Sequence, residues 1–287
     1  CLDRDPAGMG MMENASDNSC RMIEGKGNPM ATKPVVISRR ASAVNAMSEE
    51  ERQIRVDLAA CYRLVAHYGM DDLFATHISV RVPGAEEHFL LNPYGVLFEQ
   101  ITASDLVKVD LDGNIVQDTQ FTINPAGFVI HSAVHAARPD AKCVLHTHTV
   151  AGMAVASTQE GLLPLTQKSM RFYNRIGYHD YEGVADNLDE RERLVRALGK
   201  HNALILRNHG LLTCGPTVGR AFFLMRNLEK SCQTQIAAMS TGATLIKLSP
   251  NLMEYAAGQF EGGYDGRANG WPALLKMLDG LDPSYRN

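Results

Sequence analysis

The sequence predicts an α/β fold in which a single domain carries helices on both faces of one sheet. Two observations predict this class. Short apolar runs with the character of strands alternate along the chain with amphipathic segments of helical spacing, and no internal repeat or linker divides residues 46–270. The 287 residues are 45% hydrophobic and 21% charged, so the chain can bury a sizeable core without disulfides.

The first 45 residues predict a disordered extension rather than part of the domain. They are rich in Gly, Asn, Asp and Met and contain no central apolar stretch, so we also expect no signal peptide. Met30 is a candidate start of the natural chain. Residues 48–69 then predict an amphipathic helix, because Ser48 can cap it, three glutamates fill its first turn, and Gly69 ends it.

Short alternating runs and a β-turn signal follow this helix. They predict strands within THISVRVPG (76–84) and HFLLNPYGVLF (88–98), and a hairpin that pairs Leu106–Asp110 with residues near Ile115 and Val116. Further along, apolar spacing predicts helices over 126–138, 187–199 and Val218–Ser240, and strands over Lys142–Leu145, Ile176–His179 and Ala203–Arg207. The segment 146–157 turns helical, and 241–287 is less regular, with a glycine-rich stretch at 258–270.

Composition excludes several classes of partner. The formal net charge is −4 and no block of Lys and Arg stands out, so we expect no nucleic-acid partner. No run approaches the roughly 20 apolar residues of a membrane span, so we expect no membrane partner either. Six scattered cysteines without a CxxC motif predict reduced thiols and therefore a cytoplasmic protein. A small-molecule substrate is the remaining expectation.

Three histidines carry the main chemical signal. His146 and His148 flank Thr147 at the end of a buried strand, and alternate residues of an extended chain point to the same side. His209 ends another strand, with Gly210 behind it to allow a turn. Neutral imidazoles are common ligands of divalent first-row metals, and a set of three leaves positions open for a substrate. An HxH pair alone is a weak indication, however, and spacing does not show that the side chains converge.

Several segments resemble the class II aldolase and adducin family. CVLHTHTVAGMAVAS is followed about sixty residues later by LILRNHGLLTCG and a long helix. Upstream, THISVRVPG, LLNPYGVLFEQITASDLVKVDLDGNIV and NPAGFVIHSAVHAARPDAKCVLH match the family in the same order, so the resemblance covers about residues 50–245. It implies an α/β/α layered domain over 46–250 whose central sheet is largely antiparallel.

The resemblance also implies a metal site and an assembly. His146, His148 and His209 fall on the family's three metal ligands, which hold one divalent ion per chain: zinc, iron or manganese. It further implies a homotetramer with its sites at subunit interfaces. Residues 251–287 would then be a C-terminal extension that contacts a neighbouring subunit.

The chain departs from the sugar-phosphate aldolases of this family at two places. Those enzymes carry Pro-Ser-Ser-Glu before the helix that precedes the HxH, and their Glu transfers a proton. Here the segment reads Asn124-Pro125-Ala126-Gly127, so the Glu position is Gly127 and the phosphate-binding serines are absent. The Gly-Asn of their other phosphate loop is replaced by Thr76-His77. Other segments resemble adducin head domains, yet animal adducins have lost the full metal triad that this chain keeps.

Six further side chains are candidates for the site, and most have a structural alternative. His77 could be an acid/base or a further ligand, or a strand histidine hydrogen-bonded to backbone. His131 and His135 lie one helical turn apart and could bind metal, although packing is the simpler interpretation. Tyr181 or His179 could line the pocket or belong to a solvated loop. Asn208, directly before the third ligand, could support it.

These observations favour a metal-dependent lyase that performs aldol-type cleavage or decarboxylation on a small carbonyl or carboxylate compound, and not a phosphosugar aldolase. His77 and Tyr181 are the predicted catalytic residues, because Gly127 offers no base. A non-haem Fe(II) oxygenase on the same three histidines is the alternative. A second alternative is a non-catalytic, adducin-like binding scaffold, against which the intact triad argues.

Overall fold

The computed structural model describes residues 47–84, 87–183, 189–261 and 270–287, all within one compact unit, Asn45–Asn287. The predicted extension over 1–45 lies outside the described residues. None of the helices in this described part is both long and apolar enough to cross a membrane.

One sheet of seven strands forms the centre of the domain. The strands are β1 (Ile78–Arg81), β2 (Phe89–Leu91), β3 (Val107–Val109), β4 (Cys143–Thr147), β5 (Gly177–His179), β6 (Ala203–Leu206) and β7 (Gly210–Gly215). Their spatial order is β3-β2-β1-β4-β7-β6-β5. Every neighbouring pair is antiparallel except β5 and β6, which are parallel. The largely antiparallel sheet that the resemblance implies is therefore confirmed.

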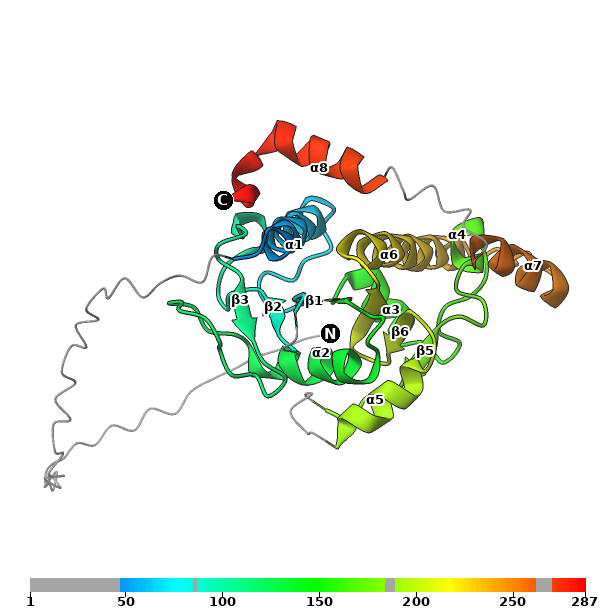
Figure 1. Cartoon of the computed structure of the whole chain (residues 1–287). Coiled ribbons are helices and arrows are strands. Elements are labelled where there is room, and N and C mark those ends of the chain that lie inside the picture. The colour runs from blue at the N-terminus through cyan, green and yellow to red at the C-terminus, as the bar shows by residue number, and fades with distance from the viewer. Residues whose placement is uncertain (1–46, 85–86, 184–188, 262–269) are drawn as a thin grey trace, which may run out of the picture. The chain divides into compact units, whose positions relative to one another are not determined.

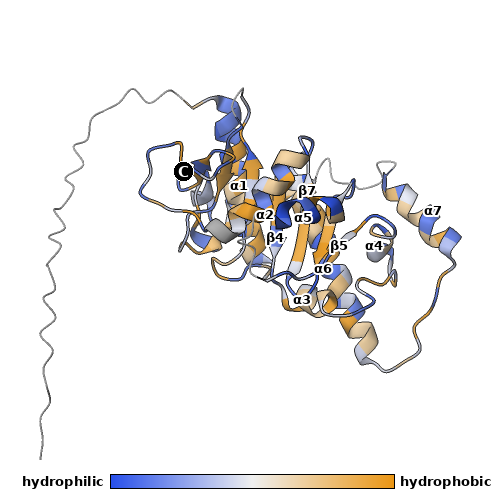
Figure 2. Ribbon diagram, turned by 90° about the horizontal axis from the view of Figure 1, so that it is seen from below, coloured by the Kyte–Doolittle hydropathy of each residue, from blue (hydrophilic) through white to orange (hydrophobic). Residues whose placement is uncertain are grey.

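Helices cover both faces of this sheet. Figure 1 shows α1 (Glu49–His67) and α6 (Val218–Ser240) on one side of the strands, and α2 (Pro125–Ala137) and α5 (Glu190–Leu198) on the other. Side-chain alternation in the central strand β4 explains both layers: Leu145 packs in the core under α1 and α6, whereas its neighbour Val144 packs in the core under α2 and α5. Figure 2 shows β4, β5 and β7 as hydrophobic and much of α5 as hydrophilic, as expected for an inner sheet and an outer helix.

The predicted first helix and hairpin are confirmed. The Ser48 hydroxyl accepts a hydrogen bond from the Glu51 backbone N–H at 3.1 Å and so caps α1. Arg55, buried on the same helix, pairs with Glu51 and donates to the Leu106 carbonyl at 2.8 Å, which ties α1 to the start of β3. Val109 forms a β-bridge with Ile115, on the far side of the predicted turn.

Residues 241–287 are more regular than expected. They contain α7 (Pro250–Glu261), α8 (Gly270–Leu281) and a short 3-10 helix, η2 (Pro283–Arg286). α8 and η2 pack against α1, where Tyr285 is fully buried and the Trp271 indole donates to Asp57 at 3.0 Å. Glycines in and between these helices hid the helical periodicity. The other short elements are η1 (Phe98–Gln100), α3 (Val150–Ala156) and α4 (Gln167–Met170).

Candidate metal centre

Two segments that are distant in sequence bring three imidazoles together. β4 pairs antiparallel with β7, with His146 opposite Leu212, so the end of β4 lies beside the start of β7. His146 and His148 come from the end of β4, and His209 directly precedes β7. The ring centroids are 4.6 to 4.9 Å apart, and one nitrogen from each ring lies within 4.8 Å of the others. The three side chains singled out in the sequence therefore lie together in the structure.

Hydrogen bonds decide which ring nitrogens face the centre. His146 Nδ1 lies 2.9 Å from the Leu211 carbonyl oxygen, and His148 Nδ1 lies 3.1 Å from a carboxylate oxygen of Asp72. Because both oxygens only accept, each Nδ1 carries a proton, and in the neutral form of either ring Nε2 carries a lone pair. These two Nε2 atoms are 2.8 Å apart. Two lone pairs at that distance repel each other unless a cation lies between them.

The pKa values of His146 and His209 also favour a bound metal ion at this site. Burial, followed by the neighbouring His209 and His148, holds the pKa of His146 well below its usual range. Burial and the nearby His148 and His179 lower the pKa of His209 to about 4. Both rings are therefore neutral near pH 7, the form that binds metal. The donor set fits one divalent metal ion, held by the three imidazoles.

The turn before β7 depends on backbone conformation. Asn208 has a φ of 56°, and its backbone N–H donates to the Ala156 carbonyl at 3.1 Å. A Cβ at Gly210 would lie 2.4 Å from the Thr147 carbonyl oxygen, so only glycine fits there. The exposed Asn208 side chain makes no hydrogen bond with a described residue. Asn208 thus supports His209 through the backbone conformation of the turn. The support through its side chain that the sequence suggested is absent among the described residues.

The three imidazoles line a cavity of about 290 Å³. His77 and Tyr181 line it too, His77 at 5% exposure and Tyr181 at 56%. The remaining described lining residues are Ala75, Asn124, Gly127, Ile130 and Gly183. Both side chains predicted as catalytic therefore face the same space as the triad, and no Lys or Arg is among these described lining residues.

His77 fills the space that a side chain at position 127 would need. A Cβ built on Gly127 would lie 2.2 Å from Cε1 and Nδ1 of the His77 ring. Neither nitrogen of this ring has a hydrogen-bond partner among the described residues, so the interpretation as a ring bonded to backbone is wrong. Burial, followed by the nearby His148, lowers the pKa of His77 to about 4. His77 is not part of the three-histidine cluster.

The close approach of His77 to Gly127 predicts a steric effect. Gly127→Ala should lower the free energy of unfolding by about 1–3 kcal/mol relative to Gly258→Ala, because only the first substitution overpacks a buried site. Gly258 is the matched control: it also lies in a helix, and nothing lies within 4 Å of the position its Cβ would take. Urea denaturation of both variants measures the difference. Equal stability of the two would contradict the packing described here.

The remaining candidates have structural partners. His131 and His135 are buried and both bond to the Ser79 hydroxyl, so they pack in the core and do not form a metal pair. His179 is buried and bonds to Glu190 at 3.0 Å, which excludes a solvated loop for this residue. Sequence reasoning missed Asp72, which orients His148 from a loop before β1. An exposed carboxylate far from its partner in sequence leaves no local signal.

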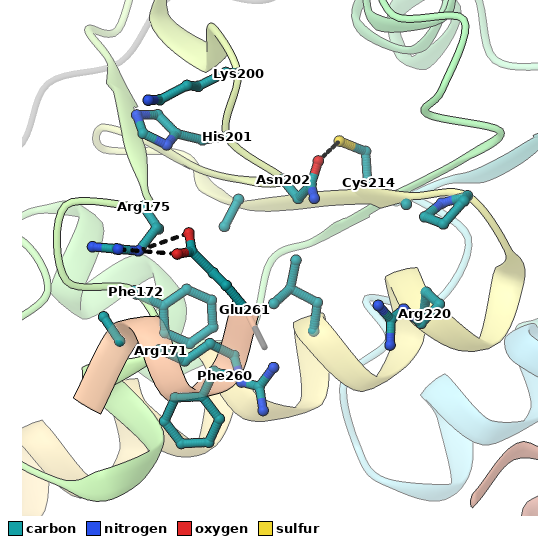
Figure 3. A pocket seen from close by; sticks show the side chains of 15 residues that line it. Arg171, Phe172, Arg175, Lys200, His201, Asn202, Cys214, Arg220, Phe260 and Glu261 are labelled. Carbon is teal, nitrogen blue, oxygen red and sulfur yellow. Dashed lines mark hydrogen bonds and ion pairs between the residues drawn. The ribbon is translucent and has the colours of Figure 1, made fainter. Parts of the chain in front are cut away.

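A second cavity, of about 410 Å³, lies at the opposite end of β6 and β7. Figure 3 shows the basic side chains that line it, among them Arg175, which is joined to Glu261 by two hydrogen bonds of 3.0 and 3.1 Å. The Arg171 guanidinium stacks over the Phe260 ring at 4.3 Å. Salt bridges and stacking hold these two arginines against α7, and the described residues around the cavity contain no cluster of metal ligands.

Comparison with known proteins agrees with the fold. The sequence profile of the family described as "Class II Aldolase and Adducin N-terminal domain" matches residues 56–236. The chain belongs to the class II aldolase and adducin family. A solved aldolase II superfamily protein from Pseudomonas syringae is 49% identical, with a TM-score of 0.81 and alignment over 84% of this chain and 98% of that one.

Two further relatives represent the aldolase and adducin sides of the family. The structure of L-fuculose 1-phosphate aldolase from Glaciozyma antarctica PI12 is 30% identical, with a TM-score of 0.73, and covers 83% of this chain and 93% of that one. Alpha-adducin of Rattus norvegicus is 39% identical in an alignment 259 residues long that covers 84% of this chain and 35% of adducin. This class II aldolase domain therefore corresponds to about a third of adducin.

Proposed function

We propose that this class II aldolase family member is a metal-dependent lyase that breaks a carbon–carbon bond in a small carbonyl or carboxylate compound, by aldol-type cleavage or decarboxylation. One observation carries the proposal. The unpartnered His77 imidazole fills the space above Gly127 and lines the same cavity as the three ligand imidazoles. The chain thus offers a group that can transfer protons beside the position where the family's aldolases carry Glu.

The groups that would bind the metal differ from the groups that orient them. His146, His148 and His209 would hold one divalent ion, with zinc, iron and manganese as the candidates. When bound, such an ion supplies Lewis-acid polarisation of a substrate oxygen. Asp72 and the Leu211 carbonyl keep the Nδ1 protons of His148 and His146 in place, which leaves both Nε2 lone pairs for the ion.

His77 can perform the proton transfers of aldol cleavage. The substrate's β-hydroxyl loses a proton, the carbon–carbon bond breaks to leave a carbonyl, and the bonding electron pair remains on the other fragment, which then takes up a proton. Neutral His77 can accept the first proton at a free ring nitrogen and return it to the second fragment. The Tyr181 phenol, largely exposed on the cavity wall, is a second donor for that last step.

The lining favours a substrate without phosphate. No Lys or Arg is among the described residues of the cavity wall, and Pro125 and Ala126 replace the phosphate-binding serines of the aldolases. A phosphorylated sugar, as in the name of the L-fuculose 1-phosphate aldolase, would find no Lys or Arg side chain among the described residues of this wall. Hydroxy and keto acids without phosphate are the compounds to screen first.

Metal content is the first test. We expect elemental analysis of protein purified without oxygen to find about one zinc or manganese per chain, and carbon–carbon cleavage to appear in a screen of hydroxy and keto acids. About one iron per chain, with oxygen uptake during turnover, would contradict the lyase proposal and favour an oxygenase. No metal, even after reconstitution, would leave a non-catalytic binding scaffold.

A further inference from the structure

A row of buried polar groups leads from the cavity into the interior of the domain. His131 and His135 lie one turn apart on α2, and Ser79 lies opposite them on β1. The Ser79 hydroxyl oxygen is 2.7 Å from His131 Nδ1 and 2.7 Å from His135 Nε2. His135 Nδ1 is in turn 3.0 Å from the Ala141 carbonyl oxygen. All three side chains are buried, so each hydrogen bond is made inside the protein.

The direction of every bond in this row follows from its last member. The Ala141 carbonyl can only accept, so His135 Nδ1 carries a proton. A neutral His135 then accepts at Nε2, which requires Ser79 to donate its single hydroxyl proton to that nitrogen. The Ser79 oxygen is left to accept, so His131 donates from Nδ1. His131 Nε2 therefore carries a lone pair and can act only as an acceptor.

Burial keeps both rings neutral, as this reasoning requires. Burial, followed by the charge of Arg81, lowers the pKa of His135 to about 3. Burial and the neighbouring His77 and His135 hold the pKa of His131 well below its usual range. Arg81 donates to the His135 carbonyl and pairs with Glu87, so it does not compete for the ring nitrogens of His135.

The free end of the row faces His77. His131 Nε2 has no partner among the described residues although His131 is only 1% exposed. The His77 ring lies next to it at a centroid distance of 6.0 Å and nearly perpendicular, at 78°. Both nitrogens of His77 also lack a partner. An acceptor without a donor thus lies beside a ring that must place one N–H, and buried polar groups of this kind are costly unless they are satisfied.

We propose that His131 is a positioning residue: its Nε2 accepts a hydrogen bond from one water molecule, which in turn accepts the N–H of His77 and so fixes the tautomer in which the other His77 nitrogen accepts protons from the substrate. The inference rests on the proposed function, because it assigns a supporting residue to His77. The row ends at a carbonyl, which cannot take up a proton. It therefore orients His77 and does not conduct protons away from the cavity.

The tautomers can be observed without turnover. In full-length, metal-loaded protein labelled with nitrogen-15 only at histidine, we expect NMR to find His131 with its proton on Nδ1 and a single neutral tautomer of His77. Removing the hydroxyl in Ser79→Ala should let both tautomers of His131 coexist. A wild-type His131 protonated on Nε2, or a mixture of His77 tautomers, would overturn the proposal before any variant is made.

A matched serine controls for loss of a buried hydroxyl. Ser132 lies on α2 beside His131 and is 3% exposed, and its one hydrogen bond among the described residues is to the Val129 carbonyl of its own helix. We expect Ser79→Ala to lower kcat roughly tenfold, the equivalent of one hydrogen bond, and to shift the acid limb of the pH–rate profile. Ser132→Ala should leave kcat and the pH–rate profile as in the wild type. Ser79→Thr should also keep both near the wild-type values, since threonine keeps the hydroxyl.

The outcomes separate this inference from the proposed function. If Ser79→Ala behaves like Ser132→Ala while His77→Gln still removes activity, the positioning role is wrong and the lyase stands. If the loaded protein cleaves no candidate substrate, the lyase is wrong, and the NMR measurement still decides whether His131 holds the tautomer of His77.

Discussion

His146→Ala should remove the metal ion and with it the activity. The substitution deletes one of three ligands and leaves two partly buried imidazoles to hold the ion. Loss of the Lewis acid removes several kcal/mol of transition-state stabilisation, so we expect kcat/KM to fall by about 10³-fold or more. Elemental analysis of the purified variant and kinetics with the best substrate from the screen measure the two effects.

A distant histidine provides the control for this variant. His67 lies exposed on α1 and contacts only Tyr68 among the described aromatic rings. His67→Ala should retain the full metal content and activity. Retention of one ion per chain by His146→Ala would show that the ion binds elsewhere and would contradict the assignment of the three ligands.

His77→Gln should separate proton transfer from metal binding. Glutamine has a similar volume and keeps hydrogen-bonding groups, but it cannot accept a proton near neutral pH. Loss of a positioned acid/base group typically lowers kcat by 10²- to 10⁴-fold, so we expect a fall of about that size with unchanged metal content. His201→Gln, the same substitution beside the second cavity, is the matched control and should leave kcat unchanged.

A double variant makes the test of His77 sharper. His77→Asn with Gly127→Glu restores the residue types that the family's aldolases carry at these positions, and it removes the ring that occupies the space above residue 127. If His77 has taken over the proton transfer, the new carboxylate should recover part of the activity that His77→Asn loses. If His77→Gln kept full activity, His77 would not be the group that transfers the proton, and Tyr181 or water would remain as the candidates.

The sequence alone predicts much of the metal centre because its signals are local. The strand before His146 and the turn at Gly210 are both short patterns, and each places an imidazole at a strand end. Their convergence is not local. It depends on the antiparallel pairing of β4 with β7, with His146 opposite Leu212, which only the resemblance to a known family anticipated.

The support around the triad could not be predicted for the same reason. Gly127 and His77 are fifty positions apart, and no periodic pattern records that one ring occupies the space left by a missing side chain. The helical spacing of His131 and His135 predicted a shared face but not the strand opposite it. Ser79 is their common partner because the fold packs α2 against β1, a contact between segments about fifty residues apart that local spacing does not encode.

The split origin of the three ligands links metal binding to folding. An unfolded chain can offer the neighbouring pair His146 and His148, but His209 joins them only after β4 and β7 have paired across about sixty residues. An ion bound by all three imidazoles therefore binds the native state alone and stabilises it by mass action. Metal occupancy and stability against unfolding would then be coupled, so we expect a chelator to lower the free energy of unfolding.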